Sequence, residues 1–485
     1  MKTLLRHGRW VAPTLALGVI LLCTLGHQSP SGRPADAVLD SRAAGGHPAG
    51  PRALVAHAGN LQVRLTWAIP AGTRGIAGYN IYRNGVRVKT GVIGHSFTDQ
   101  PLTNGRTYTY TVKAYWRKTG GASTTLSEPA KPVRATPSHP VYWGAAWIGS
   151  QFTGTTAPDD WNAVTDFERR DAGGHRLSVL GFGDPWRHQK SYCTGQMSVG
   201  GDDNYCPFPA AALQKVRSNG VIPVYTWTSQ DAGVNNPAFT DAAIAHGSQD
   251  AYLTQWAKAA KSWGHPFFLR LDQEFNGTWF PFGVNYSFTG SDGVKHTNTP
   301  QDFLSMWKHV VNVFRHIGAN NVTWVWCPNI EPMSNGGNAS TWVRGVARSL
   351  KAMYARGYVD WTCLDGYNRG KRNWNGRWST FSQTYGDTYQ AIESFAPDKP
   401  MMLGEIGSTG TGGNKSAWVS DFLKELPHFA AVRAFTWFET PDWNNDPIDG
   451  KAPAQRAFAG GVNNNQFVQN LYGNLSGGVI APPKN

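Results

Sequence analysis

The chain has 485 residues, more than one ordinary domain holds, so we expect two folded units and a targeting segment. Hydrophobic residues make up 40% of the chain and charged residues 16%, which excludes a largely disordered protein, and the 12% of aromatic residues suits a large core or a sugar-stacking surface. The formal net charge is +13, but no run of five or more Lys and Arg occurs, so we attribute the charge to solubility and expect no nucleic-acid partner.

Residues 1–37 have the pattern of an export signal. Three basic residues precede the apolar stretch 11–25, and Ala35-Asp36-Ala37 offers a small-residue cleavage site. The apolar stretch is short for a membrane span and no second one follows, so we expect cleavage rather than anchoring. The mature protein is then secreted and extracellular, has no membrane partner, and carries a net charge of +10.

Residues 38–50 are rich in Ala, Gly and Pro and are interpreted as a linker. Short alternating segments with turn signals follow in residues 51–137 and predict an all-β sandwich. Residues 61–67 and 107–116 alternate in polarity, and residues 79–85 end in an Asn-Gly hairpin turn.

Three features of this region resemble a fibronectin type III module. They are Trp67, the run Gly-Tyr-Asn-Ile-Tyr-Arg-Asn-Gly that ends at Gly85, and Leu102 six residues before Tyr108. The resemblance implies a spacer or docking unit without chemistry of its own, and we take the spacer role as the expectation.

Residues 138–485 have a different sequence pattern from the sandwich region, from which the Pro-flanked segment 135–140 separates them. Short apolar segments recur and alternate with helical patterns such as 250–263 and 303–318, in which apolar residues are spaced three and four apart. The eight apolar segments are 142–149, 177–183, 221–227, 267–274, 321–329, 361–368, 400–407 and 432–439. Eight such units predict a (β/α)8 TIM barrel, whereas an open doubly wound sheet is disfavoured because no Gly-rich phosphate loop follows the first strand.

Four cysteines remain after removal of the signal. Cys193 and Cys206 bracket a Gly- and Asp-rich loop that an exported protein could close with a disulfide. Cys327 and Cys363 lie on neighbouring predicted strands, where both a disulfide and a pair of buried thiols fit the sequence. The sequence does not decide the oligomeric state, for which we expect a monomer.

Acidic residues gather at the carboxyl ends of the predicted barrel strands, where barrels of this kind carry their active sites. The strand ends contribute Asp272, Glu274, Asp365, Glu405 and Glu439, with Trp227, Trp326 and Asn329 among the neutral ones. No cluster of His and Cys has the spacing of metal ligands, and no Gly-x-Ser-x-Gly elbow is present. We therefore expect neither a metal nor a cofactor.

Two carboxyl groups across one pocket suffice for glycosidic bond cleavage. One protonates the departing oxygen, while the other attacks the anomeric carbon. Each disfavours ionisation of the other, so that one stays protonated near neutral pH. Strands four and seven, which end in Glu274 and Glu405, are three apart around an eight-stranded ring, so their side chains face each other across its mouth.

The segments that contain these two residues, Arg270–Trp279 and Lys399–Ser408, resemble the signature segments of glycoside hydrolase family 26. Segments 161–174, 324–329, 364–368 and 436–439 agree with the same family in the same order. The resemblance covers roughly residues 140–475 and implies a TIM-barrel β-mannanase that retains the anomeric configuration.

Carried over position by position, the resemblance implies Glu274 as the acid/base and Glu405 as the nucleophile. Trp279 matches a Trp near the cleaved bond, and Tyr367 matches a Tyr whose hydroxyl holds the nucleophile ionised and oriented. Trp443 resembles an aromatic platform beneath the sugar. Arg270 is expected to lie deeper and to fix the carboxylates electrostatically.

The chain departs from the family pattern at two positions that bear on the substrate. Gln273 replaces a His that usually precedes the acid/base, so it can hydrogen-bond a sugar hydroxyl but carries no charge. Asn444 stands where the mannanases have a substrate-binding Arg. Subsite hydrogen bonds separate mannan from other β-glycans, so these positions leave the sugar open.

The leading hypothesis is a secreted endo-acting β-1,4-mannanase with a β-linked polysaccharide as its substrate. Within the same chemistry, a β-1,3-xylanase or a mixed-linkage β-glucanase is the alternative. A non-catalytic carbohydrate-binding protein and an adhesin-like structural protein are further hypotheses, and both predict that no sugar is released.

Overall fold

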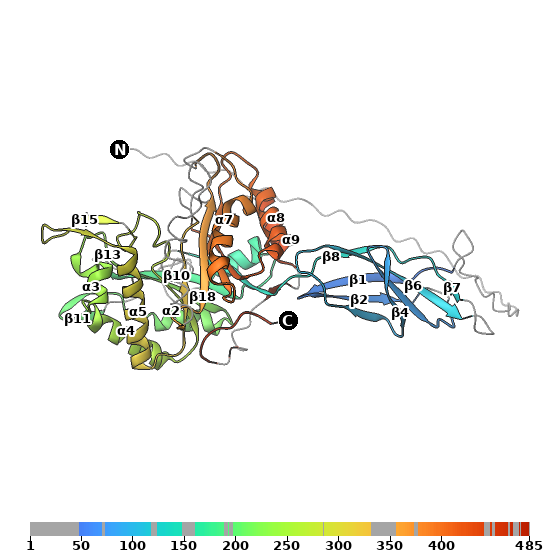
Figure 1. Cartoon of the computed structure of the whole chain (residues 1–485), viewed down its shortest axis with the longest axis horizontal. Coiled ribbons are helices and arrows are strands. Elements are labelled where there is room, and N and C mark those ends of the chain that lie inside the picture. Colours follow the sequence, from blue (N-terminus) through green and yellow to red (C-terminus); the bar gives the residue numbers. More distant parts are fainter. Residues whose placement is uncertain are drawn as a thin grey trace, which may run out of the picture.

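The structure is a computed structural model that describes most of the chain from Pro48 onward. The described residues are 48–69, 73–117, 124–147, 161–188, 193, 197–284, 286–330, 356–372, 377–440, 447–448, 452–463, 466–468, 475 and 477–484. The expected signal peptide at 1–37 and the expected linker up to residue 47 lie outside them. Figure 1 shows a β-sandwich beside a larger unit of alternating strands and helices.

The N-terminal unit is a sandwich of two antiparallel sheets. Its strands are β1 (Arg52–Gly59), β2 (Gln62–Ala68), β3 (Gly78–Arg83), β4 (Val86–Val92), β5 (Ser96–Asp99), β6 (Tyr108–Arg117), β7 (Thr124–Leu126) and β8 (Val133–Ala135). One sheet has the order β1-β2-β5, and the other has the order β4-β3-β6-β7, with β8 also paired to β6. The predicted all-β fold of this region is confirmed.

The predicted Asn-Gly turn joins β3 to β4. Asn84 and Gly85 both have positive φ, of 51° and 80°, as a two-residue hairpin turn requires. Inside the sandwich, Trp67 meets Tyr79 edge-on with ring centroids 5.2 Å apart. Alternation along the strands thus places these aromatic side chains in a core between the two sheets.

Eight parallel strands of the described chain close into a barrel. They are β9 (Val141–Ala146), β10 (Val179–His188), β13 (Ile222–Ala232), β14 (Phe267–Leu271), β17 (Val322–Trp326), β18 (Trp361–Asn368), β19 (Met401–Ser408) and β20 (Val432–Phe438). Each pairs with the next in parallel, and β20 and β10 both pair with β9, which closes the ring. The prediction of a (β/α)8 barrel is confirmed, and the open sheet is excluded.

Helices pack around the barrel. They are α1 (Asn162–Asp166), α2 (Ala210–Ser218), α3 (Asp241–Ala245), α4 (Asp250–Trp263), α5 (Pro300–Ile317), α7 (Phe381–Phe395), α8 (Lys415–Glu425) and α9 (Ala452–Val462). The predicted helix at 303–318 begins earlier than its periodicity indicated, because Thr299 and Asp302 form a capping box. In the described part of the chain, no helix combines the length and apolar character that crossing a bilayer requires.

Two tryptophans predicted near the mouth of the barrel lie elsewhere. Trp227 and Trp326 are fully buried, because strand alternation turns their side chains outward to the surrounding helices. Trp227 stacks on Trp256 of α4 at 4.3 Å, and Trp326 packs on Phe275 at 5.0 Å. These rings therefore belong to the core.

The C-terminal segment 477–484 covers the opposite end of the barrel. Ile480 is buried there; its backbone N–H donates to Thr323 Oγ1 at 2.8 Å, and its carbonyl accepts from Trp361 Nε1 at 2.8 Å. Arg433 donates to the carbonyl of Pro483 at 2.6 Å. These bonds hold the segment against the amino-terminal ends of the strands.

Both cysteine pairs left open by the sequence are bonded. Cys193 pairs with Cys206, and Cys327 pairs with Cys363. The second bond links the segment after β17 to β18, two neighbouring parts of the barrel wall. Buried thiols at these positions are therefore ruled out in this structure.

Asp241 is a fully buried acid at the start of α3. Within the described residues, neither of its carboxyl oxygens has a hydrogen-bond partner. Burial raises the pKa of this carboxyl well above its usual range, and the charges of Asp272 and Asp302 raise it further. The folded state therefore binds a proton that the unfolded state releases above about pH 4, and stability falls as the pH rises.

We expect Asp241→Asn to remove this pH-dependent loss. Any constant cost of the new amide is independent of pH, so the melting temperature of the variant minus that of the wild type should increase from about pH 4.5 to about pH 7.5. Thermal unfolding of both proteins across that range measures it. A difference that stays constant with pH would contradict the assignment of a buried neutral carboxyl.

Candidate active site

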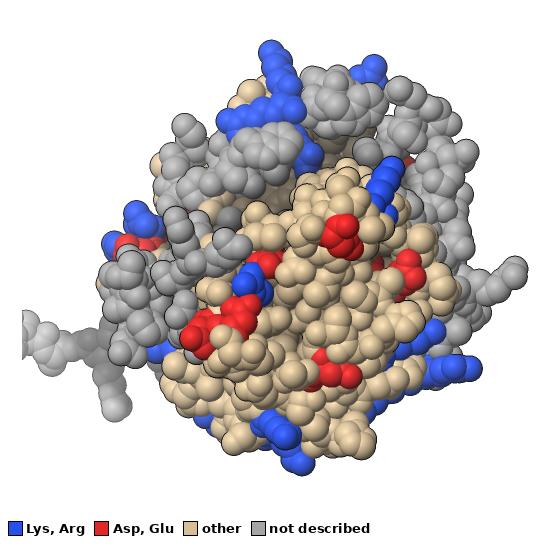
Figure 2. All heavy atoms as spheres, turned by 90° about the vertical axis from the view of Figure 1, so that its left-hand side faces the viewer, with Lys and Arg blue, Asp and Glu red and all other residues tan. Residues whose placement is uncertain are grey.

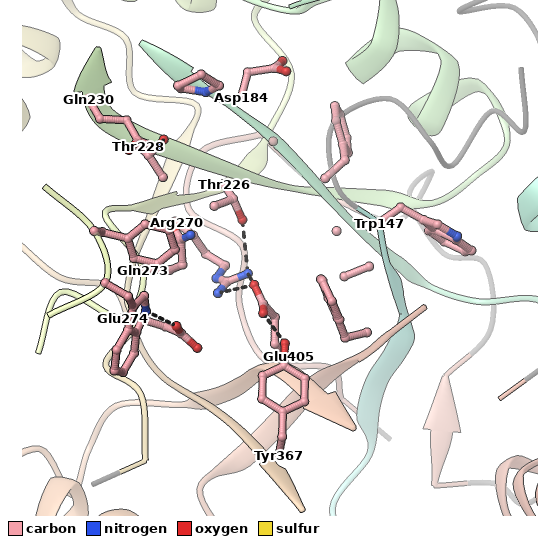
Figure 3. Close-up of a pocket in the computed structure, with 18 of the residues that line it drawn as sticks. Trp147, Asp184, Thr226, Thr228, Gln230, Arg270, Gln273, Glu274, Tyr367 and Glu405 are labelled. Carbon is pink, nitrogen blue, oxygen red and sulfur yellow. Dashed lines mark hydrogen bonds and ion pairs between the residues drawn. The ribbon is translucent and has the colours of Figure 1, made fainter. Parts of the chain in front are cut away.

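A cavity of about 450 Å³ opens at the carboxyl ends of the barrel strands, a size typical of small-molecule and sugar sites. Its walls come from β9, β10, β13, β14, β18, β19, β20 and segments that follow some of them. They include Ala146, Trp147, Phe182, Asp184, Thr226, Thr228, Gln230, Arg270, Gln273, Glu274, Trp279, Phe280, Tyr367, Arg369, Glu405 and Phe438. Figure 3 shows the carboxyl groups of Glu274 and Glu405 turned toward each other in this cavity.

Glu274 is held in an unusual backbone conformation just after β14. Asp272 and Glu274 both have positive φ, of 47° and 56°, which costs a non-glycine residue about 1–3 kcal/mol. The carboxylate of Asp272 accepts from the backbone N–H and hydroxyl of Ser229 at 2.6 and 2.7 Å, and the N–H of Glu274 donates to the carbonyl of Cys327 at 2.7 Å. Neighbouring strands thus fix the turn that aims Glu274 into the cavity.

The carboxyl group of Glu274 has two polar neighbours. Trp279 Nε1 donates to Oε2 at 2.8 Å, and the side-chain amide of Asn329 donates to Oε1. Asn329 is itself braced by Asn276, whose side chain bonds both its N–H and its carbonyl at 2.8 and 2.9 Å. Burial and then the negative charge of Glu405 raise the pKa of Glu274 to about 7, although these bonds and Arg270 act in the opposite direction.

This pKa predicts an alkaline limit of activity. The sequence predicts Glu274 as the general acid, which must be protonated to act, so kcat/KM should fall as the pH rises through about 7. In Trp279→Phe an aromatic ring remains, but the hydrogen bond from the indole N–H, which lowers the pKa of Glu274, is lost, so the alkaline limb should move to higher pH. Profiles of kcat/KM against pH for the two proteins test this. A limb that stays in place or moves to lower pH would contradict it.

Glu405 lies on β19 and is oriented by its neighbours. The hydroxyl of Tyr367 on β18 donates to Oε2, and Arg270 donates to Oε1 through Nη1 and Nη2, each at 3.3 Å. The residue before it must be glycine, because a Cβ on Gly404 would lie 2.6 Å from an oxygen of Asp365 and 2.9 Å from Nε of Arg270. The Gly-Glu sequence therefore lets β19 pass close to this charged cluster.

Arg270 is fully buried beneath the two glutamates. It forms an ion pair with Asp365, contacts Glu405, and donates to Thr226 Oγ1 at 3.1 Å. Burial alone would lower the pKa of this guanidinium, but the charges of Asp365 and then Glu405 raise it above its usual value. The site thus contains one fixed positive charge below the pair.

Oxygens of Glu274, Asp365 and Glu405 all lie within 4.8 Å of one another, close enough to hold a metal ion. The guanidinium of Arg270 already contacts two of the three carboxylates and supplies positive charge there. The cluster therefore fits a carboxyl pair above a buried cation without requiring an ion.

Tyr367→Phe should lower kcat by about 10- to 100-fold, the loss of one hydrogen bond to a charged group, with little change in KM. The ring would keep its edge-on contact with Phe438. Tyr385→Phe is a matched control, because that hydroxyl donates to backbone carbonyls, those of Gly366 and, at 3.4 Å, Glu405, rather than to a carboxylate. We expect the control to lower the melting temperature and to change kcat less than Tyr367→Phe does. Equal effects of both variants on kcat would contradict the role of Tyr367.

Trp279 and Gln273 present unused surfaces beside Glu274. The Trp279 residue is 52% exposed although its N–H is bonded to Glu274, and it passes close over Gly277, where a Cβ would lie 2.4 Å from the indole. Oε1 of Gln273 is buried at the cavity wall and has no hydrogen-bond partner within the described residues. A flat ring and a free acceptor therefore border the carboxyl pair.

Of the remaining candidates, the structure describes only Asp272 and Glu439. Trp443 and Asn444 lie outside the described residues. Asp272 serves the turn described above, and Glu439, after β20, accepts from the backbone N–H of Ile448 at 3.2 Å. The cavity-lining residues do not include Glu439.

Two residues at the site were not selected as site residues from the sequence: Asn329, a hydrogen-bond partner of Glu274, and Asp184, which lines the cavity. Asn329 appeared only as a neutral strand end, and its bond to Glu274 depends on a contact between β14 and β17 segments 55 residues apart. Asp184 also lines the wall and accepts from Tyr225 at 2.9 Å, and burial raises its pKa to about 6. A polar residue directly after the apolar segment 177–183 is a signal that could have indicated it.

No family model matches the chain. Endoglucanase H of Acetivibrio thermocellus is 30% identical over 255 residues, which are 51% of this chain and 25% of that protein, so the chain spans only about a quarter of this relative. Two solved structures are similar: a modular endo-β-1,4-mannanase from Cellulomonas fimi (16% identity, TM-score 0.46, 68% of this chain and 72% of that one) and a family GH26 β-mannanase from Bacteroides ovatus (13% identity, TM-score 0.45, 68% and 90%).

Proposed function

We propose that the chain is a secreted retaining endo-β-glycoside hydrolase in which Glu274 is the acid/base and Glu405 the nucleophile. The observation that carries this proposal is the pair itself, two carboxyl groups, one just after β14 and one on β19, with oxygens within 4.8 Å of each other. Retaining enzymes place their carboxyl groups about 5–5.5 Å apart, whereas inverting enzymes need about 6.5–9.5 Å to admit a water. The separation therefore favours retention.

The two carboxyl groups have environments suited to different tasks. Glu274, with its pKa raised to about 7, can donate its proton to the departing sugar oxygen. Glu405, oriented by Tyr367 and Arg270, then attacks the anomeric carbon and forms a glycosyl ester. In the second half of the reaction, Glu274 takes a proton from water, and the resulting hydroxide displaces Glu405 from the sugar.

Mannan-type polysaccharides are the first candidate substrate, by the resemblance of the two signature segments. Trp279 is proposed to stack on a sugar ring beside the cleaved bond, and Gln273 to accept a hydrogen bond from a sugar hydroxyl. Trp443 is proposed as the aromatic platform beneath the sugar ring at the cleaved bond. Asp184 and Gln230 are further polar groups of the same wall.

A β-glucan is the second candidate substrate. The specific observation that favours it is the similarity to an endoglucanase over 51% of this chain. Gln273, where mannanases have His, agrees with a different hydrogen-bond pattern at the cleaved sugar.

Export and the domain arrangement belong to the same proposal. Residues 1–37 are proposed as a cleaved signal, and residues 51–137 as a fibronectin type III-like module followed by a catalytic domain from residue 138.

Reducing-end assays on a panel of mannan, glucomannan, xylans, lichenan and cellulose test the function. We expect release from mannan or glucomannan. Release from lichenan alone would make a β-glucan the substrate in place of mannan, and the proposed glycoside hydrolase activity would still hold. No release from any member by folded protein would overturn the enzyme and favour a carbohydrate-binding protein.

A further inference from the structure

The positive charge of the protein is concentrated in one unit. Residues 51–137 contain twelve Lys and Arg but only two acidic residues, a net charge of +10. Residues 138–485 contain 28 of each sign and are neutral overall. Figure 2 shows acidic and basic residues interspersed on the described surface of the barrel side. A charge that served only solubility would not need this segregation.

The two acids of the sandwich neutralise little of this charge. Asp99 is buried; it pairs with Arg83 at 3.0 Å and accepts from the hydroxyl of Tyr110 at 2.8 Å. Glu128 is exposed and lies between β7 and β8, so it is not part of a strand of either sheet. Most of the remaining cations, including Arg87 and Arg134, are exposed.

Several of these cations share the outer face of the sheet β4-β3-β6-β8. Tyr110 and Val112 of β6 point into the core, so their neighbours Thr111 and Lys113 point outward. The register places Arg87 opposite Tyr82, Tyr82 opposite Thr111, and Arg134 opposite Thr109. Lys113 lies 5.8 Å from the centre of the Tyr82 ring. We call Arg87, Tyr82, Lys113 and Arg134 the basic face.

The basic face suits an extended partner rather than a small anion. It crosses four strands, three steps of about 4.8 Å, so Arg87 and Arg134 are roughly 14 Å or more apart. A single small anion would meet one solvated cation at a time, and such contacts are weak and screened by salt. A polyanion can engage all of them together and release its condensed counterions.

We infer that the sandwich binds a carboxylate-bearing polysaccharide, a chain of uronic acids, through the basic face, and so anchors the barrel beside its substrate. The inference rests on the proposed function, because a polysaccharide hydrolase works among other polysaccharides, and this favours a glycan over a nucleic acid. The half-buried Tyr82 ring lies among these cations, with Lys113 over it. The barrel is neutral and leaves the anchoring charge to the sandwich.

Native gel electrophoresis of the full chain through polygalacturonate tests the inference. We expect the wild type to be retarded at about 50 mM NaCl and to be released by about 300 mM. The triple variant Arg87→Glu/Lys113→Glu/Arg134→Glu should bind at least about tenfold more weakly. The matched control Lys258→Glu/Lys295→Glu/Lys424→Glu makes the same change in net charge at exposed barrel positions and should change binding by less than about twofold.

The outcomes separate the possibilities. Absence of retardation, equal loss in both triple variants, or stronger retention by DNA than by polygalacturonate overturns the inference. Melting temperatures check folding, and Arg87→Gln/Arg134→Gln, which alters only exposed side chains, should give a partial loss. The basic-face variants should cleave soluble substrate at the wild-type rate. Retardation without any hydrolysis would refute the proposed function alone, and hydrolysis without retardation would refute this inference alone.

Discussion

Replacing Glu405 by Ala is expected to lower kcat on the polysaccharide by on the order of 10⁴-fold or more, because no other carboxyl group in the described part of the chain faces Glu274 in the position to form the glycosyl ester. Oxygens of Glu274 and Asp365 lie within 4.8 Å of it, but Asp365 is buried and paired with Arg270. Added azide should restore part of the rate to the variant by attacking the anomeric carbon in the space that the side chain leaves. Steady-state kinetics with and without azide measure both effects.

Glu439→Ala is the matched control for this variant. It removes an acid at the end of the neighbouring strand β20 that does not line the cavity, so activity should stay within a few-fold of wild type, roughly 1 kcal/mol. A Glu405→Ala enzyme with near-normal kcat, or a control that loses as much activity, would show that the nucleophile has been misassigned.

Glu274→Ala should have an effect that depends on the leaving group. On polysaccharide, where the departing oxygen needs a proton, we expect a loss of at least roughly 10²–10⁴-fold. On an aryl glycoside with a strongly acidic phenol, the departing phenolate needs no proton, so bond cleavage should be nearly as fast as in the wild type. The product-forming step still lacks its base, so a burst of phenol followed by a slow phase is expected.

Stopped-flow measurement of the phenol gives both phases, and Asn329→Ala is its control. That variant removes a hydrogen bond to Glu274 but keeps the carboxyl group, so it should not show the same dependence on the leaving group. Equal losses of Glu274→Ala on both substrates would contradict the acid/base assignment and point to a role in substrate binding.

The barrel and the carboxyl pair were predictable from the sequence for a local reason. The strands are largely apolar runs, several of which end in acidic residues, and parallel strands in a barrel bring those ends to one face. Glu274 and Glu405 could therefore be placed in one cavity although they are 131 residues apart. The side on which a strand-end side chain lies is less apparent, and Trp227 and Trp326 were wrongly expected near the mouth.

The remaining details of the site depend on contacts that no local pattern encodes. The bond of Asn329 to Glu274, the brace from Asn276 and the ion pair of Arg270 with Asp365 each join different strands. The positive φ of Glu274 is held by the bonds of Asp272 to Ser229 and of the Glu274 N–H to the carbonyl of Cys327, which no residue type at this position indicates. The sequence contains no run of Lys and Arg in the sandwich region. That several of its cations share one face depends on the pairing of the strands.

The configuration of the first product formed by the wild-type enzyme tests the central claim most directly. Proton NMR can follow the anomeric signals of oligosaccharides released from whichever β-linked polysaccharide the enzyme cleaves, before mutarotation mixes them. The close pair of Glu274 and Glu405 predicts that the β-anomer appears first, since two displacements restore the original configuration. Initial appearance of the α-anomer would mean a single displacement by water and would contradict the assignment of Glu405 as a nucleophile.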